Sequence, residues 1–137
     1  MVKIDDDMNI ELTRGDIMSF SIKAKDKVGN DYTFQVGDVI RFKVTEKGNV
    51  ENVLIQKDNE IIEETKEAII SFNHNDTKIG DFINKPVKYW YEVELNPDTL
   101  PQTIIGYTTE NGAKIFTLLP EGGDFSDWYS WRTKRNN

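Results

Sequence analysis

The chain has 137 residues, of which 37% are hydrophobic and 30% are charged, and its formal net charge is −7. This length suits one domain with a single core, and the absence of cysteine excludes a disulfide framework, a thiolate metal site and a thiol nucleophile. Acidic and basic side chains balance in residues 120–137, so the negative charge belongs to residues 1–119 and argues against a general nucleic-acid binder.

The first predicted strands lie on either side of Arg14-Gly15-Asp16. From Ile17 to Lys25 apolar and polar side chains alternate, which is the period of a strand with one buried and one exposed face. The same alternation returns from Val39 to Thr45. Further strands are expected at residues 53–57 and 68–72, with a loop over residues 63–67, and residues 75–82 allow one helical turn capped by Asn75 or Asp76.

The clearest late strand follows Pro86 and ends at Leu95. Its predicted inner face carries the two tyrosines, Tyr89 and Tyr91, and its outer face carries Trp90. Residues 103–109 and 113–119 flank an Asn-Gly pair, which predicts a hairpin. Short strands separated by turn residues predict an all-β antiparallel sandwich or barrel over residues 1–119, followed by an extension at residues 120–137.

No motif in the chain predicts an enzyme, a cofactor or a metal site. His74 is the only histidine and has no thiol to activate, so a position at the edge of a loop is favoured over a general base beside Asp76. Glu92 and Glu94 share one face of a strand, where exposed charges are common, and this is favoured over a catalytic carboxylate pair. For Asp5-Asp6-Asp7 a solvated segment is favoured over a calcium site, because the side chains of consecutive aspartates point in different directions.

Arg14-Gly15-Asp16 has two interpretations. As an adhesion tripeptide it would bind an integrin, with Asp16 ligating a metal ion on that receptor. As a structural turn, it would use Gly15 to relieve backbone strain. The turn is favoured, because three residues recur by chance and nothing else in the chain suggests an adhesin.

The C-terminal extension is the one segment where a functional interpretation competes with a purely structural one. It contains Trp128-Tyr-Ser-Trp-Arg-Thr-Lys-Arg135, and tryptophan, tyrosine and arginine dominate interface hot spots. These side chains either dock on a neighbouring subunit or fold back over the edge of the sandwich. The predicted partner-binding residues are Phe125, Trp128, Tyr129, Trp131 and Arg132.

No apolar run resembles a signal peptide or approaches the roughly 20 residues of a membrane span. The sequence therefore predicts synthesis and folding in the cytosol, and no membrane partner.

Four segments in order resemble the N-terminal domain of the baseplate upper protein family of tailed phages infecting Gram-positive bacteria. The segment Ile10-Glu-Leu-Thr-Arg-Gly-Asp-Ile-Met-Ser-Phe-Ser-Ile22 is similar to the family's opening strand-turn-strand, with Ile17 in place of a small hydroxyl residue. The others are Gly37-Asp-Val-Ile-Arg-Phe-Lys-Val44, Val87-Lys-Tyr-Trp-Tyr-Glu-Val-Glu-Leu95, and Thr103-Ile-Ile-Gly106 with Ile115-Phe-Thr-Leu118.

The resemblance implies an immunoglobulin-like sandwich with a structural role in a phage or tailocin tail. The implied partners are other baseplate or tail proteins and symmetry-related copies of the chain, first in the host cytoplasm and then in the particle. Because the chain ends in an aromatic and basic segment rather than a linker and a second module, a stand-alone adaptor is expected. The alternative is a module that binds cell-wall glycans through Tyr89, Trp90 and Tyr91 or the C-terminal tryptophans.

Overall fold

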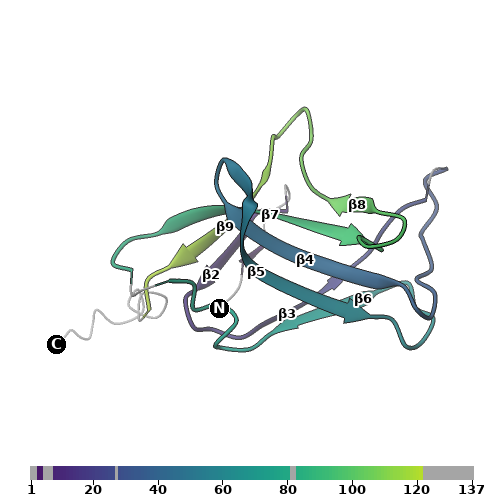
Figure 1. Ribbon diagram of the computed structural model, residues 1–137, viewed down its shortest axis with the longest axis horizontal. Helices are drawn as coiled ribbons and strands as arrows, with labels where there is room; N and C mark the ends of the chain where they lie inside the picture. The colour runs from purple at the N-terminus through teal and green to yellow at the C-terminus, as the bar shows by residue number, and fades with distance from the viewer. Residues whose placement is uncertain (1–2, 5–7, 27, 81–82, 122–137) are drawn as a thin grey trace.

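The computed structural model describes residues 3–4, 8–26, 28–80 and 83–121. These residues form strands and loops and no helix, which confirms the all-β prediction (Figure 1). The strands are β1 (Lys3–Ile4), β2 (Ile10–Thr13), β3 (Met18–Ile22), β4 (Val39–Glu46), β5 (Asn49–Glu60), β6 (Ala68–Phe72), β7 (Val87–Leu95), β8 (Gln102–Ile105) and β9 (Lys114–Leu119).

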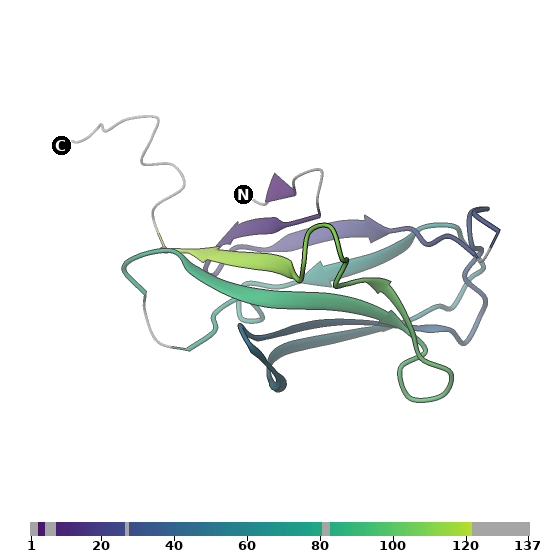
Figure 2. The same ribbon diagram turned by 90° about the horizontal axis from the view of Figure 1, so that it is seen from above.

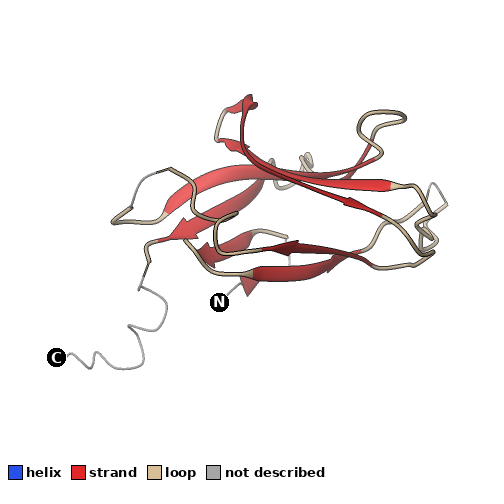
Figure 3. Cartoon of the chain, turned by 60° about the horizontal axis from the view of Figure 1, so that its bottom comes forward, coloured by secondary structure: helices blue, strands red, loops and turns tan. Residues whose placement is uncertain are grey.

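The strands build two facing sheets, in agreement with the predicted immunoglobulin-like sandwich (Figure 3). The larger sheet has the order β1-β2-β9-β7-β4-β5, with β8 also paired to β7, and the smaller sheet contains β3 and β6. All pairs are antiparallel except β2 with β9, where Ile10 lies opposite Phe116 in a parallel register. Because β2 and β3 belong to different sheets, the chain changes layer at Arg14-Gly15-Asp16.

The core lies between the sheets and is centred on Phe42 of β4, which is fully buried. Its ring stacks on Tyr91 with centroids 5.1 Å apart and makes edge contacts with rings from three other strands, Phe20, Phe72 and Phe116. The predicted inward side chains of β4 are buried, with Ile40 and Val44 at 0% exposure. On β7 those from Tyr91 to Leu95 are buried, whereas Val87 and Tyr89 at the start of the strand are only half-buried. Alternation along single strands thus identified most of the strand residues of the core, because each strand has one face toward the other sheet.

Two local predictions need correction. The strand expected at residues 53–57 is longer, because β5 starts at Asn49, and residues 49–52 carry no apolar alternation that would mark a strand. Residues 74–77 form hydrogen-bonded turns and not a helical turn. The loop is held by Asp76, whose carboxylate accepts a hydrogen bond from the Asn73 amide at 2.8 Å, while residues 81–82 lie outside the described residues.

The predicted hairpin between residues 103–109 and 113–119 is also wrong, apart from a short turn. Instead of pairing with one another, β8 and β9 both pair with β7, with Ile105 opposite Val93 and Lys114 opposite Tyr91. β8 and β9 therefore follow the same edge of β7, one after the other. Residues 106–113 form a loop between them, which is called the excursion below. The Asn-Gly signal produces only the tight turn within it, where Thr108 and Gly112 exchange backbone hydrogen bonds of 3.0 and 2.8 Å.

Candidate docking groove

The outer face of the larger sheet carries an aromatic groove whose floor is Trp90. This residue lies in β7 opposite Thr45 of β4 and Ile115 of β9. Its neighbours Tyr89 and Tyr91 face the core, and Tyr91 is 3% exposed. Trp90 therefore faces outward as predicted, but it is half-buried rather than fully exposed.

Two projecting loops form the walls of this groove. One is the tip of the β4–β5 hairpin, and the other is the excursion at residues 106–113 (Figure 1). Both rise from the outer face, and Figure 2 shows that they stand on opposite sides of β7. Val50 from the hairpin and Tyr107 from the excursion are 57% and 74% exposed. The sequence does not single out either residue, because neither belongs to a strand with a clear alternation.

The aromatic groove has a volume of about 260 Å³ and a largely apolar lining, with polar groups at Thr45, Glu92 and Lys114. Its lining residues are Thr45, Val50, Trp90, Tyr91, Glu92, Tyr107, Ala113 and Lys114. The projecting loops add Glu46, Glu51 and Glu110 and a single cation, Lys47, so they are acidic overall. This arrangement can accept a flat apolar group whose flanks are positively charged.

A row of ion pairs follows the groove along the same face. The Lys43 ammonium lies 3.1 Å from Glu92 and 3.6 Å from Glu94, in agreement with the charged strand face expected for these carboxylates. Farther along, the Arg41 guanidinium donates hydrogen bonds to both carboxylate oxygens of Asp58 at 2.9 Å. These hydrogen bonds lower the pKa of Asp58 and raise that of Arg41. The row is thus a stabilising charge network.

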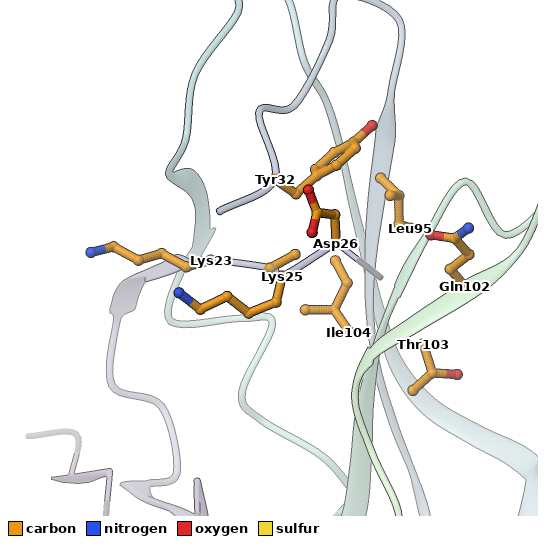
Figure 4. Close-up of a pocket in the computed structure, with 9 residues that line it drawn as sticks. Lys23, Lys25, Asp26, Tyr32, Leu95, Gln102, Thr103 and Ile104 are labelled. Atoms are coloured by element: carbon orange, nitrogen blue, oxygen red, sulfur yellow. The ribbon is translucent and has the colours of Figure 1, made fainter. Parts of the chain in front are cut away.

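A second concavity of about 640 Å³ opens where β8 faces the residues that follow β3 (Figure 4). Tyr32, Leu95 and Ile104 form its apolar part, Lys23 and Lys25 lie on one side, and Gln102 and Thr103 lie on the other. The Lys25 ammonium binds Asp31 at 2.6 Å, and this hydrogen bond lowers the pKa of the Asp31 carboxyl. Lys23 lies 3.5 Å from Glu67, so both cations already have acidic neighbours.

The Arg14-Gly15-Asp16 segment is a structural turn, as favoured from the sequence. Gly15 has a φ of +89°, which a side chain rarely adopts. The Arg14 guanidinium donates hydrogen bonds to the carbonyls of Ile79 and Gly80 at 3.3 and 2.6 Å, and it also contacts Glu121. The buried Thr77 hydroxyl donates to the Asp16 carbonyl at 2.9 Å. Because Arg14 is held against the protein, the tripeptide is not presented as an adhesion loop.

The remaining predicted sites do not come together. His74 is exposed in the loop after β6, and its carbonyl accepts a hydrogen bond from Thr77. Within the described ranges, no group of three or more His, Cys, Asp or Glu side chains is arranged to hold a metal ion. Asp5, Asp6 and Asp7 lie outside the described residues, as do all five predicted partner-binding residues, Phe125, Trp128, Tyr129, Trp131 and Arg132.

Comparisons of the chain with protein-family models, curated proteins and solved structures find no match.

In the part of the chain that the structure covers, no helix is long and apolar enough to cross a membrane.

Proposed function

We propose that this chain is a non-enzymatic structural component of a phage or tailocin baseplate or tail tip. It would act as an immunoglobulin-like adaptor that docks onto the tail and links it to fibres or receptor-binding proteins. Two observations support the proposal: the resemblance of four segments to the baseplate upper protein family, and the positions of these segments in the fold. In chain order they become the β2-turn-β3 unit, β4, β7, and finally β8 with β9, which together supply most of the sandwich core.

Two features of the chain suit a docking role. The aromatic groove offers exposed apolar side chains on a sheet face that the described residues, 3–4, 8–26, 28–80 and 83–121, leave uncovered. The C-terminal segment supplies Trp128, Tyr129 and Trp131 beyond the last strand. A domain with a receptive groove and a separate aromatic segment has the parts that an adaptor between two neighbours requires.

The test is mass spectrometry of purified tail particles, separated from free protein. We expect the chain at a fixed ratio to the tail-tube protein, and its absence from intact particles would overturn the structural role. Incorporation of a W128A/Y129A/W131A variant would then be compared with that of I62A, a control at a site that is 83% exposed. We expect the triple variant to be depleted at least about tenfold, on the scale of an interface hot spot, and I62A to be incorporated normally.

A module that binds bacterial cell-wall glycans is the second candidate, and the presence of both Trp90 and Tyr107 in the lining of one groove favours it. Aromatic faces stack on sugar rings, and Glu92, which also pairs with Lys43 at 3.1 Å, adds a carboxylate to the lining of the same groove. A cell-wall pull-down that compares the unmodified chain with W90A distinguishes the two functions. Retention that depends on Trp90 would favour the glycan module, whereas a pure adaptor shows no retention.

A further inference from the structure

We propose that the aromatic groove binds a tryptophan from the C-terminal segment, residues 122–137, of a neighbouring copy of this chain. The inference rests on the proposed structural function and specifies a partner for the groove. The indole of either Trp128 or Trp131 would occupy the groove, and the basic residues at 132–135 would lie along the acidic loops.

The chemistry of the two surfaces is complementary. The groove offers Trp90, Tyr107 and Val50 as apolar contacts and has room for about one aromatic side chain. The loops on either side carry three glutamates and one lysine, whereas residues 132–135 contain Arg132, Lys134 and Arg135. A tryptophan in the groove would bury apolar area, while these cations approach the glutamates or stack on Tyr107. An acidic or purely polar segment would neither bury apolar area in the groove nor bring cations to the glutamates.

The course of β9 favours binding in a neighbouring copy. This strand starts at Lys114 beside the groove and runs away from it to Leu119 (Figures 1 and 2). At about 3.3 Å per residue, β9 ends about 17 Å from Lys114 and points away from the groove. To fill its own groove, the segment would have to reverse over its own sheet face, whereas a neighbour can receive it without a reversal.

The resulting contact joins two different surfaces, a groove on one copy and a segment on the next. Such heterologous contacts generate rings when the rotation between copies closes, and open filaments when it does not. Head-to-tail exchange of the C-terminal segment therefore supplies a route to the symmetric assembly expected for the chain in a particle.

The first test follows the Trp90 indole N–H by NMR. Trp90 is the only tryptophan left in a full-length W128A/W131A chain, because the protein has three. We expect a synthetic peptide of residues 122–137 to shift this resonance saturably. A peptide with alanine at both tryptophans, and a receptor chain with Tyr107→Ala added, should each bind about tenfold or more weakly. An unchanged resonance at millimolar peptide would overturn the proposal.

The second test is complementation, measured by analytical ultracentrifugation. W90A keeps the segment but loses the groove, W128A/W131A keeps the groove but loses the segment, and Y107A replaces W90A if that variant misfolds. Each variant alone should remain monomeric, and a mixture should form a 1:1 pair whose association weakens as salt is added. An unmodified chain that stays monomeric at all concentrations, with Trp90 shifted as in the peptide complex, would show that the segment fills its own groove and would overturn the neighbouring-copy arrangement.

Together with the particle analysis, these tests separate failure of the inference from failure of the proposed function. If the chain enters particles but the peptide does not bind, the inference fails and the structural role stands. If the peptide binds but the chain is absent from particles, self-assembly stands and the tail role fails.

Discussion

Through its carboxylate, Asp38 joins the start of β4 to the loop before it and to the residue that follows β7. It accepts hydrogen bonds from the Tyr32 hydroxyl at 2.7 Å, the Gln35 amide at 2.9 Å and the Asn96 side chain at 3.1 Å. Burial alone would raise the pKa of Asp38, but these hydrogen bonds outweigh it and hold the pKa below its ordinary value. For Tyr32, burial and then the hydrogen bond to Asp38 raise the pKa to about 12.

We therefore predict an acid-sensitive contribution to stability at this position. Because the folded-state pKa is depressed, the contribution is complete above the unfolded pKa of about 3.9 and is lost as the pH falls through the folded value. Asp38→Asn should lower the free energy of unfolding at pH 7 by about 1–3 kcal/mol, and this difference should shrink below pH 4. Urea unfolding between pH 7 and pH 3 measures it, with the exposed Glu64→Gln as control. A difference that stays constant with pH would contradict the assignment.

At the scale of elements, the excursion at residues 106–113 interrupts an edge that would otherwise be continuous. Ile105 lies opposite Val93 and Lys114 lies opposite Tyr91, so β8 and β9 follow the same edge of β7 in the same direction. The excursion contributes little to the core, since Tyr107 is 74% exposed and no residue from 106 to 113 belongs to the buried cluster.

Removal of residues 107–113 should accordingly leave the sandwich folded. Lys114 would then stand two residues after Ile105 and opposite Tyr91, which is the spacing of an uninterrupted antiparallel strand. We expect a β-type circular dichroism spectrum and a cooperative thermal transition, but no binding of the 122–137 peptide, because one wall of the groove is gone. Loss of the thermal transition would mean that the excursion holds β8 and β9 in register.

At the scale of the whole molecule, side chains close the sandwich where the two sheets share no backbone pairing. Asn59 donates a hydrogen bond from β5 to the Ile69 carbonyl of β6 at 2.6 Å, and Lys57 reaches Asp76 at 2.9 Å. At the end of the sandwich where the chain passes from β2 to β3, Arg14 donates hydrogen bonds from its guanidinium to the carbonyls of Ile79 and Gly80. It also contacts Glu121. Its side chain is 10% exposed, so these hydrogen bonds are largely shielded from water.

We predict that Arg14→Ala lowers the free energy of unfolding by about 1–3 kcal/mol, because it leaves these carbonyls without their donor. Arg14→Lys should recover only part of this loss, since an ammonium cannot reproduce the planar fork of a guanidinium. Denaturant unfolding provides the measurement, and Lys47→Ala at the exposed hairpin tip serves as the control. Equal stability of R14A and the unmodified chain would show that Arg14 does not join the two layers.

The all-β class, the positions of β3, β4, β6 and β7, and most inward side chains of β4 and β7 could be predicted from the amino-acid sequence. It also indicated correctly that Trp90 faces outward and that Arg14-Gly15-Asp16 forms a turn. These features are local: a period of two and a glycine at a turn can be recognised without knowing which strands pair. The predicted partner-binding residues remain predictions, because they lie outside the described residues.

Which strands are neighbours and what surrounds Trp90 depend on contacts between distant parts of the chain, and these could not be predicted from the sequence. The parallel pairing of β2 with β9, the shared edge of β8 and β9, and the meeting of Val50 and Tyr107 over Trp90 all join residues far apart in the chain. The Asn-Gly pair was misleading for the same reason. It favours a tight turn, and that turn is present between Thr108 and Gly112, but the flanking residues gain more by pairing with β7 and burying Phe116 and Leu118 than by pairing with each other.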